Sequence, residues 1–232
     1  MEQGIFYAVG VGAGDPMDMT LRAKQVLEQA DVIIAPITKP GGTSAAYAIA
    51  AQAADLSRGE KLELLFPMKA HADYRERLRN GMLLPVTSAL DAGKQVAMVT
   101  LGDVSVYSTA SYVRQLLAEQ GYTVQVVAGV PSFCSGAAKA QQSLCENGES
   151  LEILPGVASR EAVEQALSRA DNLVIMKAGK ALPWLLPLLE AQGLLEHTTM
   201  LRDVGMASEY IGRPELEPYS YFTTLLIRRG GK

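Results

Sequence analysis

The feature that most constrains the fold is a glycine-rich turn that follows an apolar run and precedes a helix, and it occurs twice. The first turn is residues 9–16 (VGVGAGDP), ahead of a helix that we expect to start near Thr20. The second is residues 101–103 (LGD), which has the same neighbours. Because glycine has no β-carbon, a ligand can approach the backbone at such turns. The pattern predicts two loops that grip a ligand mainly through main-chain groups.

Two common nucleotide-binding motifs do not fit the first turn. Asp15 stands where a dinucleotide fingerprint has its third glycine, and the next strand has its acid, Asp31, at its start and not at its end. A phosphate-binding P-loop is excluded, because no Gly-Lys-Ser/Thr follows. A tight strand-to-helix turn without a ligand stays open as the simplest alternative.

Composition narrows the class of protein. The chain has 232 residues, of which 48% are hydrophobic and 20% charged, as in ordinary globular proteins. Its net charge of −4 offers no basic surface, so we expect no nucleic-acid partner. The longest apolar stretch, 182–189, is too short to span a bilayer and contains two prolines. With no signal-peptide pattern either, we expect a cytoplasmic protein without membrane contact.

Cysteine and histidine are sparse. Cys134 and Cys145 form no CxxC motif, and we expect both to be free thiols. His71 and His197 lie far apart without cysteine neighbours, so we expect no metal held by protein ligands.

The first half of the chain alternates strand and helix. Ala23, Val26, Leu27 and Ala30 follow helical spacing, with Thr20 as the expected cap. The expected strands are 5–10, 32–35, 62–66 and 95–101. The further expected helices are 43–56, 72–80, 85–92 and 108–120, and Gly81 breaks the helical pattern between the second and third of these. Short connections predict a parallel sheet covered by helices, with ligands at the carboxyl ends of its strands.

The second half has a different pattern. The expected strands are 123–128, 151–154, 172–178, 199–204 and 219–228, with a helix at 132–142. Because no long helix separates the last two strands, part of this sheet should be antiparallel. We therefore predict an α/β fold of two domains, residues 1–120 with a mainly parallel sheet and residues 121–232 with a mixed sheet. No linker composition separates them, so we expect close packing with a ligand cleft between them.

Taken together, the turns resemble the tetrapyrrole methylases, the S-adenosylmethionine-dependent enzymes of the corrin and siroheme pathways. The resemblance is carried, in order, by residues 9–16, 19–23, 30–33, 101–112, 128–133, 174–177 and 202–206. Residues 102–109 (GDVSVYST) look like the subgroup that methylates carbon 20 of precorrin-2 or cobalt-factor II. The chain departs from the family at Val104, where proline is usual, and at Pro131, where threonine or serine is common.

The resemblance implies methyl transfer from a sulfonium to an electron-rich ring carbon, a reaction in which positioning dominates. It implies a cofactor site bordered by Pro16, Leu101, Gly102, Asp103, Val106, Ser132, Phe133, Met176, Gly205 and Thr224. Candidate substrate contacts are Gly12, Asp15, Tyr107, Ser108, Lys177 and Arg202, with Arg114 and Lys139 as further partners for substrate carboxylates. Asp103 and Tyr107 are the candidate catalytic groups. Asp15 and Asp103 have an alternative role as helix caps.

Three questions stay open at this stage. The sequence leaves open whether the substrate is metal-free precorrin-2 or cobalt-factor II. It also leaves open whether the enzyme methylates carbon 20, another ring position, or uroporphyrinogen III. A non-catalytic nucleotide-binding α/β protein is the alternative from a different class. The resemblance also implies a homodimer, with the apolar segments 45–54 and 184–186 as candidate partner-facing surfaces.

Overall fold

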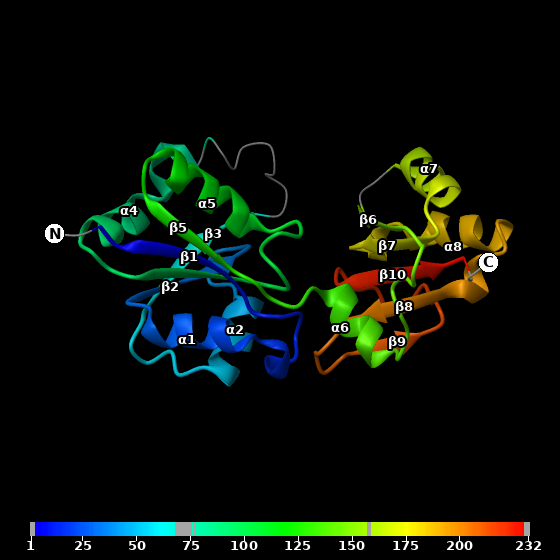
Figure 1. Ribbon diagram of the computed structural model, residues 1–232, viewed down its shortest axis with the longest axis horizontal. Coiled ribbons are helices and arrows are strands. Elements are labelled where there is room, and N and C mark those ends of the chain that lie inside the picture. The colour runs from blue at the N-terminus through cyan, green and yellow to red at the C-terminus, as the bar shows by residue number, and fades with distance from the viewer. Residues whose placement is uncertain (1–2, 68–75, 77, 157–158, 230–232) are drawn as a thin grey trace. The chain divides into compact units, whose positions relative to one another are not determined.

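The computed structural model describes residues 3–67, 76, 78–156 and 159–229. The chain forms two compact units, divided after Pro131, and each is built on a five-stranded sheet of its own (Figure 1). Histidine 71 and most of the helix expected at 72–80 lie outside the described residues.

The first unit contains a wholly parallel sheet. Its strands are β1 (Ile5–Gly10), β2 (Val32–Ile37), β3 (Glu60–Leu65), β4 (Val96–Thr100) and β5 (Thr123–Val127), in the order β3-β2-β4-β1-β5. Its helices are α1 (Leu21–Gln29), α2 (Ala45–Ala53), α4 (Leu84–Asp91) and α5 (Thr109–Glu119), with a short 3-10 turn at Pro16–Asp18 and a π-helical turn at Leu78–Met82.

Both faces of the three central strands, β2, β4 and β1, are largely buried, which explains the continuous apolar runs in these strands. Ile33 packs in the core beneath α1 and α2, whereas its neighbour Ile34 packs in the core beneath α4 and α5. Thr20 caps α1 as predicted, because its hydroxyl oxygen accepts a hydrogen bond from the Ala23 amide at 3.1 Å. The alternation of strand and helix therefore produced the parallel α/β unit that the sequence predicted.

The second unit contains a mixed sheet, also as predicted. Its strands are β6 (Leu151–Pro155), β7 (Asn172–Met176), β8 (Thr198–Arg202), β9 (Tyr210–Gly212) and β10 (Thr223–Arg228), in the order β6-β7-β10-β8-β9. Only β6 and β7 are parallel, and the other pairs are antiparallel. Its helices are α6 (Ser132–Lys139), α7 (Arg160–Arg169) and α8 (Leu182–Ala191), with 3-10 turns at Ala178–Lys180 and Leu195–His197.

Several boundaries differ from those expected. Strand β5 pairs with β1, so it lies in the first unit, and the division falls after Pro131 and not near Gly121. The expected strand at 219–228 begins only at Thr223, because residues 219–222 have no strand partner. The expected break at Gly81 is instead a π-helical turn with Gly81 at φ +99°. Sequence reasoning missed α7, α8 and the short strand β9.

The apolar segments expected to face a partner contribute mainly to the cores of their own units. In α2, Ala46, Ile49 and Ala50 are buried against the sheet. In α8, Leu185 is fully buried, and Trp184 and Leu186 pack against the same core.

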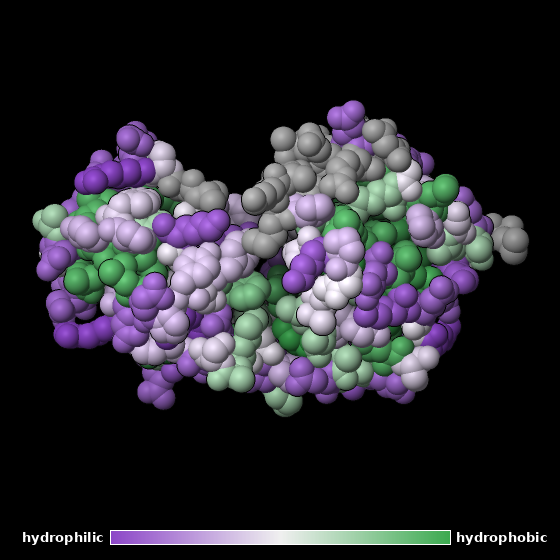
Figure 2. Space-filling model, turned by 180° about the vertical axis from the view of Figure 1, so that it is seen from behind, coloured by the Kyte–Doolittle hydropathy of each residue, from purple (hydrophilic) through white to green (hydrophobic). Residues whose placement is uncertain are grey.

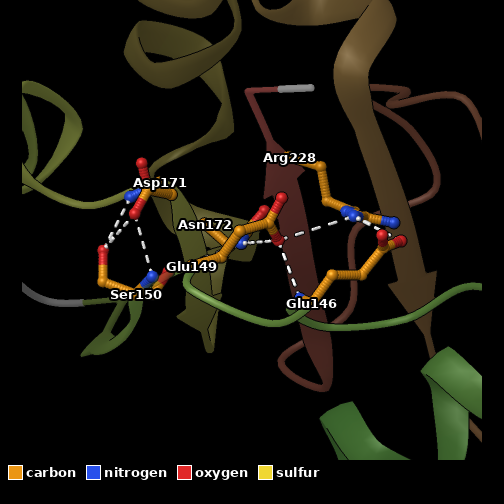
Figure 3. Close-up of polar contacts among 6 residues, drawn as sticks. All are labelled: Glu146, Glu149, Ser150, Asp171, Asn172 and Arg228. Atoms are coloured by element: carbon orange, nitrogen blue, oxygen red, sulfur yellow. Dashed lines mark hydrogen bonds and ion pairs between the residues drawn. The ribbon is translucent and has the colours of Figure 1, made fainter. Parts of the chain in front are cut away.

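A polar network fixes the segment before β6, at the end of the second sheet where β7 begins and β10 ends (Figure 3). Glu149 accepts a hydrogen bond from the Asn172 side chain at 2.8 Å and lies 3.6 Å from the Arg228 guanidinium. Asp171 accepts hydrogen bonds from the amide and hydroxyl of Ser150, at 2.9 and 2.8 Å. These contacts hold the ends of neighbouring strands together.

On the face shown in Figure 2, apolar areas lie between hydrophilic side chains on both units. Among the described residues, every helix is too short or too polar to cross a membrane.

Candidate functional site

Three loops meet at the carboxyl edge of the first sheet. Strands β4, β1 and β5 are adjacent and parallel, so the loops that follow them leave the sheet side by side. These loops begin at residues 101, 11 and 128, and they include both turns singled out in the sequence. The predicted position of the turns, at the strand ends where α/β sheets bind ligands, is confirmed.

The first and second loops are joined through their glycines. Gly12 and Gly102 form an isolated antiparallel bridge, in which the Gly102 amide donates to the Gly12 carbonyl at 2.7 Å and the Gly12 amide donates to the Gly102 carbonyl at 3.3 Å. Gly12 has φ +80° and Gly102 has φ +67°, a conformation that side chains disfavour. Backbone conformation therefore favours glycine at both positions.

The third loop packs directly on this bridge. A β-carbon on Gly129 would lie 2.1 Å from the Gly102 carbonyl oxygen and 2.8 Å from the Cα of Gly10. A β-carbon on Gly10 would in turn lie 2.7 Å from the same oxygen. We call Gly10, Gly12, Gly102 and Gly129 the glycine junction. At Gly10 and Gly129 the requirement for glycine comes from close packing of backbone on backbone.

Asp103 connects the second and third loops through its carboxylate. Oδ2 accepts a hydrogen bond from the Gly129 amide at 2.7 Å, and Oδ1 accepts from the Ser105 amide at 2.8 Å and from the Ser105 hydroxyl. Burial by itself would raise the pKa of Asp103, but the hydrogen bonds from Ser105 and Gly129 outweigh it and lower the pKa below its ordinary value. The side chain is an anion that the protein itself satisfies.

Asp15 and Pro16 lie in the first loop, where Asp15 caps a short 3-10 turn. Its carboxylate accepts a hydrogen bond from the Met17 amide at 2.9 Å, and Pro16 is the first residue of the turn. The cap of α1 is Thr20, whose hydroxyl also donates to the carbonyl oxygen of Ala128 in the third loop at 3.1 Å. Asp15 is therefore a cap, as the alternative prediction held. It caps the 3-10 turn at Pro16–Asp18 and not the following helix α1.

Tyr107 and Ser108 connect the second loop to α5. Tyr107 has φ +47° and is 50% exposed, and burial of part of its ring raises the pKa of its hydroxyl. Ser108 is buried and caps α5, with its hydroxyl donating to Thr100 at 3.1 Å and accepting from the Ala110 amide at 3.2 Å. Of the two, Tyr107 has the more accessible side chain.

Two of the cofactor residues predicted in the second unit lie opposite each other on β7 and β10. Met176 ends β7 and pairs with Thr224 of β10. The next residue, Lys177, has φ +58°, and its ammonium group lies 5.7 Å from the centre of the Tyr221 ring. A β-carbon on Gly156, after β6, would lie 2.3 Å from the Met176 carbonyl oxygen, so the ends of β6 and β7 pack as closely as the loops of the first unit.

Gly205 and Arg202 are engaged within the second unit. The Gly205 amide donates to Glu209 Oε2 at 2.6 Å, and the Lys139 ammonium donates to the same oxygen at 2.8 Å. These two groups, Lys139 first, lower the pKa of Glu209. Arg202 is 7% exposed, and its guanidinium lies 4.7 Å from the centre of the Tyr210 ring. It also donates to the Pro218 carbonyl oxygen at 3.3 Å, which favours a structural role.

The remaining candidates are placed as follows. Leu101, Gly102 and Val106 are half-buried in the second loop. Ser132 and Phe133 begin α6, and the Phe133 ring is buried. Arg114 lies on α5, and its buried Nε has no hydrogen-bond partner among the described residues. Among the described residues, no three His, Cys, Asp or Glu side chains are grouped so that they could hold a metal ion.

Sequence reasoning missed Gly129 and Glu209 as partners of candidate residues. The Asp103–Ser105 spacing is a usable signal, because aspartate commonly accepts from the amide two residues on. No local pattern reveals Gly129 as the second partner, since it lies 26 residues away.

A parallel sheet with close-packed glycine loops at its carboxyl edge is the architecture of α/β proteins, a class that commonly binds small ligands at that edge. Residues 6–218 match the model of the Tetrapyrrole (Corrin/Porphyrin) Methylases, and the chain belongs to this family. The resemblance drawn from the ordered motifs is confirmed.

Relatives support the narrower grouping. The chain is 32% identical over 234 residues to the cobalt-precorrin-2 C(20)-methyltransferase of Salmonella typhimurium (strain LT2), with 97% of each chain covered. It is 29% identical to a precorrin-2 C(20)-methyltransferase of a Sinorhizobium species, with 97% of this chain and 95% of the relative covered. The uroporphyrin-III C-methyl transferase of Thermus thermophilus, solved with S-adenosylhomocysteine, has a TM-score of 0.68 at 21% identity, with 97% of each chain covered. The two-domain α/β fold is therefore confirmed.

Proposed function

We propose that this protein transfers a methyl group from S-adenosylmethionine to carbon 20 of precorrin-2 or of its cobalt complex. The observation that carries the proposal is the full-length similarity to a cobalt-precorrin-2 C(20)-methyltransferase, at 32% identity over 97% of both chains. The motif at 102–109, which resembles that subgroup, supports the same position on the ring.

The described residues fit a donor of this kind. Half-buried Leu101 and Val106 offer apolar surface in the same loop as Gly102, and half-buried Met176 offers apolar surface at the end of β7 in the second unit. S-adenosylmethionine supplies an already activated methyl group, so the protein needs to orient and to exclude water more than to move protons. Alignment of two reacting atoms can provide about 7–11 kcal/mol of a barrier.

The roles of individual candidates follow from their contacts. We propose that the second loop binds the donor through main-chain groups of Leu101 and Gly102 and through the Val106 side chain. Tyr107 and Lys177 are the proposed substrate contacts, because their side chains are at least partly exposed. Arg202 is a weaker candidate, since it is buried against Tyr210.

The test is transfer of a carbon-13 methyl group from labelled S-adenosylmethionine, with precorrin-2 and cobalt-factor II assayed in parallel. We expect one labelled product, with the methyl carbon placed at position 20 by NMR. Label at another position would favour a methylase of a different ring site, and uroporphyrinogen III should be included as a third substrate for that reason. No label in any macrocycle would end the proposal.

The non-catalytic alternative is separated by calorimetry. The methylase proposal requires binding of S-adenosylhomocysteine, whereas a general nucleotide-binding protein should bind NAD at least as well.

We further propose a cytoplasmic homodimer, as the family resemblance implies. Met17 and Leu21 are 87% and 86% exposed and provide apolar surface for such an interface. Light scattering at micromolar concentration tests this assembly, and a purely monomeric species would contradict it.

A further inference from the structure

We propose that Asp103 is a positioning residue, which holds the third loop against the second in the geometry that the methyl donor requires and acts through the Gly129 amide without touching the donor. The identity of the donor rests on the function proposed above. The contacts of Asp103 themselves do not depend on it.

The first argument is that both carboxylate oxygens already have partners inside the protein. Oδ2 accepts from the Gly129 amide at 2.7 Å, and Oδ1 accepts from the amide and the hydroxyl of Ser105. Charge-assisted bonds of this length are among the stronger hydrogen bonds in proteins. Because Ser105 and Gly129 donate to different oxygens, the carboxylate is fixed in place between the second and third loops.

The second argument is the position of the group that Asp103 holds. Gly129 packs on the carbonyl of Gly102 and on the backbone of Gly10, so its amide lies in the glycine junction. On its other side, the carbonyl of Ala128 accepts a hydrogen bond from Thr20 of the first helix. A shift of Gly129 would therefore disturb all three loops of the candidate cofactor site together.

The third argument concerns what remains when the carboxylate is changed. Asparagine has nearly the same shape but only one acceptor oxygen, so Asp103→Asn would leave either Ser105 or Gly129 with its amide facing an NH₂ group. A part-buried donor without a partner is costly, and the cheapest relief is for the third loop to move away.

A direct role for Asp103 makes a different prediction. A carboxylate that screens the sulfonium would favour S-adenosylmethionine, which is cationic at sulfur, over S-adenosylhomocysteine, which is not. A residue that only shapes the site affects both ligands alike. The ratio of the two affinities therefore separates positioning from direct contact.

The experiment measures the Kd of both compounds by calorimetry for the wild-type protein, for Asp103→Asn and for Asp31→Asn. We expect Asp103→Asn to weaken both ligands by the same factor, about tenfold, and to raise KM for the donor more than it lowers kcat. Asp31 is the matched control, because its carboxylate also accepts a hydrogen bond from a backbone amide, that of Gln95 at 2.9 Å. This bond lies at the amino ends of β2 and β4, away from the three loops at the carboxyl ends. Its substitution should lower stability and leave both affinities unchanged.

A second readout needs no ligand. The Gly129 amide proton should shift in NMR spectra as Asp103 is protonated at acid pH, and that titration should vanish in Asp103→Asn. Loss of affinity for S-adenosylmethionine alone, or an unchanged Gly129 amide in the variant, would overturn the proposal. If the wild-type protein binds neither compound, the proposed function fails, while the Gly129 titration still decides whether Asp103 holds the third loop.

Discussion

Substitution of Gly129 by alanine tests the glycine junction most directly. The added β-carbon would lie 2.1 Å from the Gly102 carbonyl oxygen and 2.7 Å from the Gly10 carbonyl carbon, both of them backbone atoms. Real β-carbons essentially never approach closer than 3.0 Å, so the two loops must separate by about 0.9 Å. That displacement would lengthen the 2.7 Å bond from the Gly129 amide to Asp103.

The cost follows from these two effects. Overpacking costs about 1–3 kcal/mol, and a weakened hydrogen bond to a charged group costs about 1.5–3 kcal/mol when it is lost. We expect Gly129→Ala to lower the free energy of unfolding by about 3 kcal/mol and to weaken S-adenosylhomocysteine binding at least tenfold. Urea denaturation and calorimetry measure the two quantities.

Gly121→Ala is the matched control for this substitution. Gly121 has φ +88° but no atom within 4 Å of an added β-carbon, so only backbone strain of about 1–2 kcal/mol applies and binding should not change. If Gly129→Ala were as stable as the wild type and bound the ligand equally well, the inferred close packing of the three loops would be refuted.

Four further predictions follow from the structure. Leu185→Ala should cost about 2–5 kcal/mol in urea denaturation, because Leu185 is fully buried in the core of the second unit, and a neutral result would return α8 to the candidate partner surfaces. Arg202→Met should change stability more than KM for the substrate, since the guanidinium packs on Tyr210, and a large rise in KM without a stability change would instead identify a substrate contact. The Gln95 amide hydrogen bond holds the pKa of Asp31 below its ordinary value of 3.8, so its contribution to stability is complete above that pH and is lost as pH falls through the lowered pKa. Asp31→Asn should flatten this acid limb of stability against pH, and an unaltered limb would exclude Asp31 as its cause. Saturating S-adenosylhomocysteine, at a hundred times its Kd, should stabilise the protein by about 2.7 kcal/mol in thermal or urea unfolding, and NAD at the same concentration should not.

The sequence by itself determined the features that depend on local interactions. Thr20 caps its helix through the Ala23 amide three residues away, so the local cap pattern was sufficient to locate it. The glycine turns at 9–16 and 101–103 mark strand ends, because backbone conformation at Gly12 and Gly102 is a property of those residues themselves. The order of these motifs also indicated the family before any contact was known.

Only the tertiary structure decided which distant groups meet. Strand β5 pairs with β1 and so belongs to the first sheet, although the sequence placed it in the second domain. Its five residues alone do not determine which strand they pair with. The sequence suggested a ligand contact for Asp103 and a substrate contact for Arg202. Only the folded chain shows that Asp103 accepts a hydrogen bond from Gly129 and that Arg202 is buried against Tyr210. Burial and long-range hydrogen bonding are set by elements remote in the chain, which is why the residue types were informative about the chemistry and the folded chain was needed to assign their roles.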